Sequence, residues 1–350
     1  MVGDVRVPSW QAMTGEQIRR WTEALDHLAT MLPLGAITVI VDGHTPHART
    51  LADRLATALA GVGRPCHRLT DTDPLTDDDI WRADRGPNTV ALADGPRWRA
   101  RPPVESWTVA IWLRTEAPSG GDDHGDDADI VIDLRDPCWP VIRHAAAAIA
   151  DRHRWYVSES RAFYGPRAET WDTRFGDDLP AYAAAVTDAV LPAGATVLDV
   201  GCGTGRALPA LRNAVGPTGI VIGADITPEM LAVAQASRRN GDAVLLLADA
   251  RHLPLADNVL DAVFAAGLIT HLPDIPAGLV ELARVTRVGG RLVIFHPSGR
   301  AAVAARHGRQ LGPSETLARD PLHALLAATG WRLESYEDPP HRFLAIATRR

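Results

Sequence analysis

Three glycines and an aspartate in the segment 196–205 (TVLDVGCGTG) form the pattern in this chain that is best suited to ligand chemistry. An apolar, β-branched run predicts a strand that ends in Asp199, and glycines follow at the alternate positions Gly201, Gly203 and Gly205. Glycine tolerates left-handed backbone conformations and lets the backbone come close to a ligand. A helix is expected to follow (ALPALRNAV), so its N-terminal N–H groups and positive dipole end would face whatever lies over the loop.

Two more aspartates end predicted strands further along the chain. Asp225 closes GIVIGAD, and Asp249 closes AVLLLAD. An acidic residue at the end of the second strand commonly accepts hydrogen bonds from a ribose, because its carboxylate has two acceptor oxygens. Taken singly, each aspartate is equally an ordinary turn residue at a strand end. The G-x-G-x-G spacing of the loop differs from the G-x-G-x-x-G of nicotinamide-binding folds, which argues against a nicotinamide cofactor.

Residues 190–350 resemble the class I S-adenosylmethionine-dependent methyltransferases. VLDVGCGTG is similar to the first motif of that family, and VIGADITPEM is similar to its second strand with the acidic end. LLLADARHLPLADNVLDAVFAAGLITHLPD is similar to the third and fourth strands, and RVGGRLVIFHP to the fifth strand behind a Gly-Gly turn. Such an ordered series is far more specific than a lone glycine loop.

The resemblance implies an α/β fold with a Rossmann-like, seven-stranded methyltransferase sheet and helices on both faces. The strands are expected at 196–200, 219–225, 243–248, 260–265, 291–296, 331–337 and 342–348. The last two should form a hairpin, with strand seven inserted antiparallel into a mostly parallel sheet.

The same resemblance implies S-adenosylmethionine as the cofactor and assigns residues to its parts. Asp199 and the loop would hold the methionine portion; the loop comprises Gly201, Cys202, Gly203, Thr204 and Gly205. Asp225 would take the ribose hydroxyls, and Asp249 and the Ala250 N–H would face the adenine edge. The adenine face would pack on Ile226 and Met230, and Gly267 would also border the cofactor.

Residues 163–190 would cap the cofactor site in this family. The candidates in this segment are Tyr164, Trp171, Arg174 and Phe175, and the Arg174 guanidinium offers a bidentate fork to the methionine carboxylate. Trp171 and Phe175 are equally well explained as core residues.

A hydroxyl methyl acceptor needs a base, and histidine is the usual choice near neutral pH. His271 and His296 follow predicted strands, at the sheet edge where ligands bind in open α/β folds. A histidine at the position of His271 is often a packing residue instead, and His307 and His341 lie further on. The N/D-P-P-Y signature of nucleic-acid base methylation is absent, because the corresponding stretch reads AAGLITHLPD. We therefore expect a small-molecule methyl acceptor, methylated at oxygen or nitrogen, of the kind found in secondary metabolism.

The first 150 residues predict a second α/β domain with a P-loop-like parallel sheet. A strand at 36–42 and a helix at 48–62 flank GHTPHART, which lies on the frame G-x-x-x-x-G-K-[ST]. With later strands in NTVALADGP, SWTVAIWLR and ADIVIDLRDP, residues 35–150 resemble the uridine kinase group of P-loop kinases. Ala48 stands where the second glycine belongs, and Arg49 where the lysine belongs.

These replacements argue against retained phosphoryl transfer. Arginine differs from lysine in reach and geometry, Pro46 removes a backbone donor, and alanine resists the left-handed conformation. Thr50 could still bind magnesium, and Asp94 or Asp133 could still serve as acids. Two alternatives therefore stay open: a bifunctional nucleoside-type kinase and methyltransferase, and a non-catalytic cofactor-binding scaffold.

Composition fits a two-domain enzyme. The chain has 350 residues, 46% of them apolar, and a net charge of −7. We expect domains at 1–150 and 191–350, joined by a connecting helix and cap at 151–190, with the helix extending from 144 to 164. No segment predicts a membrane span or signal peptide, and the cysteines lack metal-ligand spacing, so a cytoplasmic protein without a metal site is expected. The acidic balance disfavours nucleic acid as a partner, and a homodimer stays open.

Overall fold

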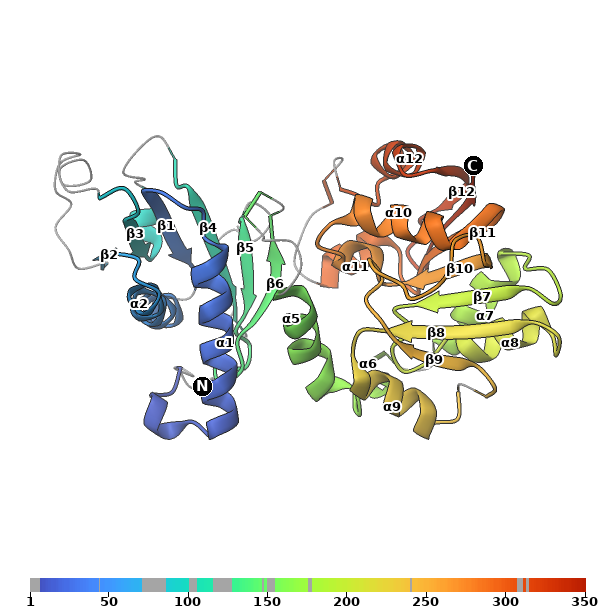
Figure 1. Cartoon of the computed structure of the whole chain (residues 1–350), viewed down its shortest axis with the longest axis horizontal. Coiled ribbons are helices and arrows are strands. Elements are labelled where there is room, and N and C mark those ends of the chain that lie inside the picture. The colour runs from blue at the N-terminus through green and yellow to red at the C-terminus, as the bar shows by residue number, and fades with distance from the viewer. Residues whose placement is uncertain are drawn as a thin grey trace. The chain divides into compact units, whose positions relative to one another are not determined.

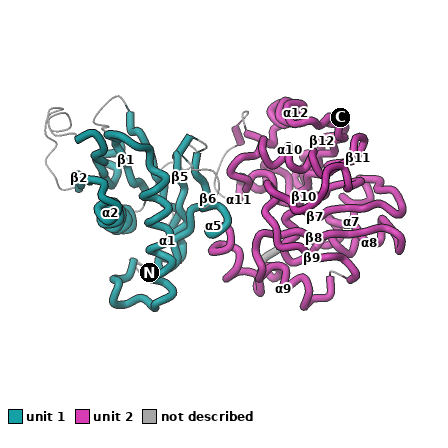
Figure 2. The backbone as a smooth tube through the Cα atoms, viewed as in Figure 1, with its two compact units in different colours: residues 1–159 teal, residues 160–350 magenta. Residues whose placement is uncertain are grey.

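The computed structural model describes residues 7–43, 45–70, 86–100, 106–115, 128–146, 148–149, 155–175, 178–239, 241–306, 311–312 and 315–350. The chain divides into two compact units, Met1–Glu159 and Ser160–Arg350 (Figure 2). His307 lies outside the described residues.

The first unit is built on a six-stranded sheet in the order β2-β3-β1-β4-β5-β6. Its strands are β1 (Ile37–Asp42), β2 (Cys66–Leu69), β3 (Val90–Asp94), β4 (Val109–Arg114), β5 (Ile130–Asp133) and β6 (Val141–Ala145). The pairs from β2 through β5 are parallel, and β6 runs antiparallel to β5. The central strand β1 is buried along its whole length, as its continuous apolar run predicts for a strand covered on both faces.

The described helices of this unit include η1 (Trp10–Ala12), α1 (Gly15–Met31), α2 (Thr45–Gly61) and α4 (Pro96–Arg99). Helix α1 begins with a capping box, in which Thr14 and Gln17 each satisfy the other's backbone N–H. Helix α2 begins at Thr45, ahead of the predicted start at 48.

One helix prediction is wrong at its start. Residues 144–145 belong to β6, where His144 pairs with Val131 of β5, and helix α5 spans only Trp155–Tyr164. Alanine-rich sequence favours a helix locally, but this segment covers the edge of β5, whose backbone groups would otherwise lack partners.

The second unit contains the predicted seven-stranded sheet, in the order β12-β13-β11-β10-β7-β8-β9 (Figure 1). Its strands are β7 (Thr196–Val200), β8 (Ile220–Asp225), β9 (Val244–Leu247), β10 (Leu260–Ala266), β11 (Thr286–His296), β12 (Trp331–Glu337) and β13 (Phe343–Arg349). The hairpin and the antiparallel insertion of β13 are confirmed, since β13 pairs antiparallel with both β11 and β12. Strand β11 begins earlier than the predicted start at 291, because Thr286 already pairs with Leu260.

Helices cover both faces of this sheet. They are η3 (Gly165–Arg167), α6 (Trp171–Phe175), α7 (Leu179–Asp188), α8 (Leu208–Val215), α9 (Pro228–Ala236), η4 (Ile269–His271), α10 (Ile275–Val285), α11 (Arg300–Arg306) and α12 (Arg319–Ala328). Side chains of β10 alternate between the faces: Phe264 joins a core cluster with α7 and α8, whereas Val263 and Ala265 join a cluster with α10 and α12. This two-sided burial fixes the register of the strands, and with it the edge at which their carboxyl ends meet.

Candidate cofactor site

The carboxyl ends of β7, β8 and β10 lie side by side, because these strands are neighbours and parallel. The glycine loop after β7 is hydrogen-bonded to this edge of the sheet. The N–H groups of Gly201 and Cys202 both donate to the Ala224 carbonyl near the end of β8, at 2.8 and 3.0 Å. The predicted loop is therefore tied to the neighbouring strand, at the place where open α/β sheets bind ligands.

The three glycines of the loop have positive φ angles, 72° at Gly201, 53° at Gly203 and 82° at Gly205. A Cβ atom at Gly201 would lie 3.1 Å from Leu268, and one at Gly205 would lie 3.1 Å from Leu208. At Gly203, by contrast, no described protein atom lies within 4 Å of such a Cβ. The loop is thus crowded against the protein at its two ends and open at its centre, which leaves backbone accessible to a ligand there.

Asp199 lies at the base of the loop and is 1% exposed. Neither of its carboxylate oxygens has a hydrogen-bond partner among the described residues. Burial, together with the nearby Asp225 carboxylate, raises the pKa of Asp199 to about 8. Charged groups are rarely buried unpaired, so this carboxyl has the environment expected of a group that pairs with a ligand cation.

Asp225 at the end of β8 is braced by the backbone. Its Oδ2 accepts from the Gly203 N–H at 2.9 Å, and its Oδ1 accepts from the Thr227 N–H at 2.8 Å. Burial raises the pKa of Asp225, although these backbone hydrogen bonds act in the opposite direction. Each carboxylate oxygen can accept more than one hydrogen bond, so both retain capacity for a ligand hydroxyl.

The residues predicted at the adenine end lie on the same edge. Asp249 is held by Arg251, whose backbone N–H donates to Oδ1 at 3.0 Å and whose Nη2 donates to Oδ2 at 2.7 Å. Despite burial, these contacts lower the pKa of Asp249 and keep it ionised. Ile226 is half-buried, and its carbonyl accepts from Arg161 Nε at 2.8 Å; Met230 and Ala250 are buried.

The cap segment brings aromatic rings to this site. Tyr164 packs edge-on against Trp171, with ring centroids 5.5 Å apart, and also against His271 at 6.4 Å. The backbone of Arg174 lies in α6, but its side chain and that of Phe175 are outside the described residues. The predicted Arg174 contact therefore stays a prediction.

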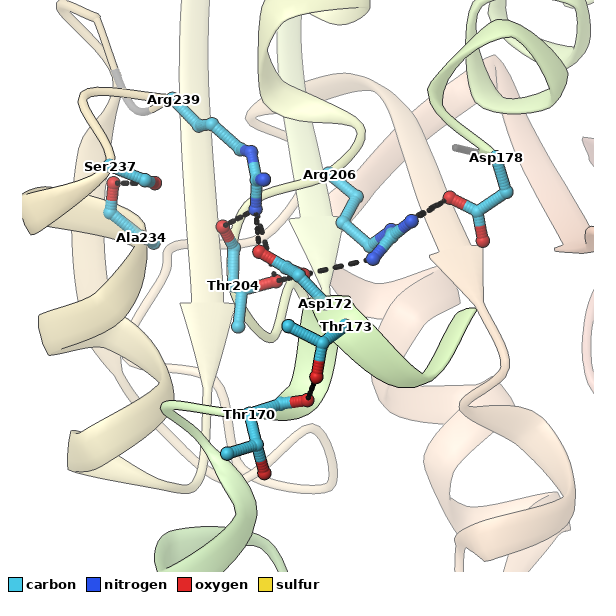
Figure 3. A network of polar contacts seen from close by, with 9 residues as sticks. All are labelled: Thr170, Asp172, Thr173, Asp178, Thr204, Arg206, Ala234, Ser237 and Arg239. Carbon is cyan, nitrogen blue, oxygen red and sulfur yellow. Dashed lines mark hydrogen bonds and ion pairs between the residues drawn. The ribbon is translucent and has the colours of Figure 1, made fainter. Parts of the chain in front are cut away.

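A group of charged residues that the sequence reasoning missed joins the cap to the glycine loop (Figure 3). Asp172 of α6 accepts from Thr204 Oγ1 at 2.7 Å and from Arg206 Nη1 at 2.9 Å, and it also pairs with Arg239. Arg206 in turn donates to Asp178 through Nε at 2.8 Å. Local patterns do not reveal these contacts, because the partners are far apart in the sequence. The only sequence signal was an arginine directly after the loop and acidic residues in the cap.

The two candidate bases occupy different positions. His296 ends β11 beside Gly267, whose N–H donates to the Phe295 carbonyl at 2.9 Å. Burial lowers the pKa of His296, so the ring is neutral at physiological pH. His296 Nδ1 contacts the Ser298 backbone, at 2.9 Å from the carbonyl oxygen and 3.0 Å from the nitrogen. His271 is exposed at the end of η4, the turn after β10, and His341 is exposed just ahead of β13.

Across the described ranges, no three His, Cys, Asp or Glu side chains lie close enough together to hold a metal ion. Every helix within those ranges is too short or too polar to cross a bilayer.

Residues 198–294 match the family model described as a methyltransferase domain. The demethylmenaquinone methyltransferase of Bacillus licheniformis is 38% identical over 109 residues, which cover 31% of this chain and 47% of that protein. Methyltransferase GfsG of Streptomyces halstedii is 43% identical over 106 residues, covering 29% of this chain and 37% of that protein. A solved S-adenosylmethionine-dependent methyltransferase from Aquifex aeolicus is 25% identical, covers 49% of this chain and 92% of its own, and has a TM-score of 0.42.

The match spans less than half the length of these two curated relatives. Within that span, residues 198–294 of the second unit are similar to a methyltransferase domain. The prediction of S-adenosylmethionine as the cofactor is confirmed.

Proposed function

We propose that the protein is a methyltransferase that transfers a methyl group from S-adenosylmethionine to an oxygen or nitrogen atom of a small molecule. One observation carries this proposal most directly: the carboxyl of Asp199, at the base of the glycine loop, is buried and has no hydrogen-bond partner among the described residues. The cofactor has an ammonium group at its amino-acid end. Pairing with that cation would satisfy Asp199 and return its pKa toward the ordinary range.

The other site residues fit the remaining parts of the cofactor. Asp225 has acceptor capacity left for the ribose hydroxyls, and the backbone at Gly203 can approach the methionine portion. Asp249, ionised beside Arg251, would accept from the adenine amino group. These assignments follow the predictions made from the sequence, and the geometry described above supports them.

When bound, the cofactor supplies a methyl group on a positively charged sulfur. The protein's own contribution is to align the acceptor with the methyl–sulfur bond and to exclude water. A hydroxyl acceptor must also lose a proton, and we assign this role to His296 in preference to His271. Two tautomers of the neutral His296 ring fit the Ser298 backbone, because Nδ1 can donate to the carbonyl or accept from the N–H. In the tautomer whose Nδ1–H donates to the carbonyl, Nε2 can accept a proton.

The substrate class is inferred from two observations. The demethylmenaquinone methyltransferases, by their name, act on a small molecule, and they are similar to this chain over the matched segment. The cap places the Tyr164 ring beside His271 and the Trp171 ring beside Tyr164, which suits an organic acceptor better than a charged polymer backbone.

For the first unit we propose a P-loop-like domain that no longer transfers phosphate. Helix α2 already includes residues 45–50, whereas the G-x-x-x-x-G-K-[ST] motif needs an open loop there. Thr50 Oγ1 donates to the Pro46 carbonyl at 2.9 Å. Arg49 Nε lies 3.8 Å from Asp94 Oδ2, so the cation of the motif faces a carboxylate. This arrangement weighs against the bifunctional kinase.

The decisive experiment has two steps. Calorimetry with S-adenosylhomocysteine tests binding in the wild type and in Asp199→Asn, with Asp242→Asn, an exposed carboxylate of the same unit, as the matched control. Incubation with methyl-labelled cofactor and fractionated small-molecule extract, followed by mass spectrometry, then tests transfer. Label in a small product that depends on Asp199 supports the proposal. Label in protein or nucleic acid contradicts the substrate class, and binding without any transfer favours a scaffold.

A further inference from the structure

The carboxylate of Asp172 is the meeting point of three segments that are distant in the sequence. It accepts from the Thr204 hydroxyl in the glycine loop at 2.7 Å and from Arg206 Nη1, directly after the loop, at 2.9 Å. It also pairs with Arg239, which follows helix α9 (Figure 3). One cap residue therefore contacts both the glycine loop and the segment that follows helix α9.

Arg206 extends this network to a second cap residue. Its Nε donates to Asp178 at the start of α7 at 2.8 Å, and its Nη2 also pairs with Asp178. The Arg206 side chain is only 7% exposed, so these two carboxylates help to compensate its buried charge. Arg239 also reaches the loop backbone, since its Nη1 donates to the Thr204 carbonyl at 3.4 Å.

Among the described residues, this network joins the carboxylates of Asp172 and Asp178 to the guanidinium groups of Arg206 and Arg239. Removing one charge from such a partly buried set weakens the compensation of the others, so the members act as a unit. The Thr204 hydroxyl proton is engaged by Asp172, which gives this residue a role in joining loop to cap that differs from direct cofactor binding.

We propose that Asp172 is a positioning residue, which holds helix α6 and the start of α7 against the glycine loop and thereby controls how fast the cofactor leaves. This inference rests on the proposed function for its ligand, but the network itself exists without a ligand. Trp171, the preceding residue, packs against Tyr164, and Tyr164 against His271. Helix α6 therefore also packs, through Trp171, on the Tyr164 ring that contacts the candidate base His271.

The test compares Asp172→Asn with Glu169→Gln. Asparagine keeps the size of the side chain and an acceptor for Thr204, but it removes the charge that faces Arg206 and Arg239. Glu169 is an exposed carboxylate in the same segment, so its amide variant controls for a change of charge alone. Arg239→Lys is a second, milder variant that keeps the charge but loses the guanidinium geometry.

Two measurements follow, and the first needs no ligand. Hydrogen exchange of the backbone amides of residues 165–175 should be about tenfold faster in Asp172→Asn than in the wild type and Glu169→Gln. Stopped-flow kinetics should then show S-adenosylhomocysteine dissociating about tenfold faster from Asp172→Asn, with little change in the association rate. For Arg239→Lys, both the exchange rate and the dissociation rate should lie between those of the wild type and Asp172→Asn.

If hydrogen exchange of residues 165–175 is unchanged in Asp172→Asn, the network does not hold the cap against the loop, and the proposal is wrong. Faster exchange with an unchanged dissociation rate would overturn the positioning role, because the cap would then be ordered without governing the ligand. A wild type that binds no S-adenosylhomocysteine would contradict the proposed function instead, and the exchange result would still decide whether Asp172 holds the cap.

Discussion

Asp225 Oδ2 accepts a hydrogen bond from the Gly203 N–H at 2.9 Å, which joins the end of β8 to the centre of the glycine loop. The residue expected to hold the ribose therefore also shapes the loop expected to hold the methionine portion. Gly203 has a φ of 53°, and its hydrogen bond to Asp225, at the end of the neighbouring strand β8, stabilises this conformation. The two halves of the cofactor site are thus coupled through one carboxylate.

We predict that Asp225→Ala weakens cofactor binding strongly. The substitution removes the ribose acceptor and the brace on Gly203, and one hydrogen bond to a charged group contributes about 1.5–3 kcal/mol, or roughly tenfold or more in affinity. Calorimetry with S-adenosylhomocysteine measures the loss, and Asp242→Ala provides the control. An unchanged affinity in Asp225→Ala would exclude this carboxylate from the site.

The raised pKa of Asp199 predicts that the folded protein loses stability as the pH rises. Its pKa of about 8 exceeds the ordinary aspartate value of about 3.9, so the folded state binds the proton more tightly than the unfolded state does. The stabilisation from this proton is complete below about pH 4 and is lost as the pH rises to about 8. Asparagine does not titrate. As the pH rises between those limits, the free energy of unfolding of Asp199→Asn should therefore increase relative to that of the wild type by up to about 1.4 kcal/mol per pH unit.

Denaturant unfolding of both proteins at pH 5, 6 and 7 measures this difference, and cofactor binding should be lost in the same variant. A stability difference that stays constant with pH would show that Asp199 is ionised in the folded, ligand-free protein.

The role of His296 depends on the acidity of the acceptor. With an aliphatic alcohol, His296→Ala should lower the rate of transfer by roughly 10²–10⁴-fold, whereas an acidic hydroxyl should tolerate the loss. Because burial lowers the pKa of His296, the rate should fall on the acid side of a pH profile, with its midpoint below the ordinary histidine value. His271→Ala is the comparison, and a larger defect there would transfer the role of base to His271.

The first unit is expected not to turn over ATP. Arg49 faces Asp94, and Ala48 is completely buried within the unit, so neither is arranged to hold a terminal phosphate. Phosphate release from ATP, and phosphorylation across a panel of nucleosides, should match the background in the wild type and in Arg49→Ala. Activity that Arg49→Ala abolishes would establish the kinase alternative.

The sequence alone determined the second unit in most of its detail. Alternating and continuous apolar runs defined the strands, and the family resemblance carried by the glycine loop and the strand-end aspartates implied the cofactor, because both signals lie within short segments. Asp199, Asp225 and the loop glycines all lie at the predicted edge. The start of β11 at Thr286 was missed, since its pairing with Leu260 depends on the neighbouring strand and not on local sequence.

Only the tertiary structure decided which charges meet. Asp172 and Arg239 are separated by 67 positions, and their pairing depends on how the cap and the end of α9 approach the loop. The same holds for His144, which joins β6 despite its alanine-rich surroundings, because an unpaired edge of β5 outweighs local helix preference. Periodic patterns report the face that a residue buries, whereas a charged side chain finds its partner only after the backbone has been placed.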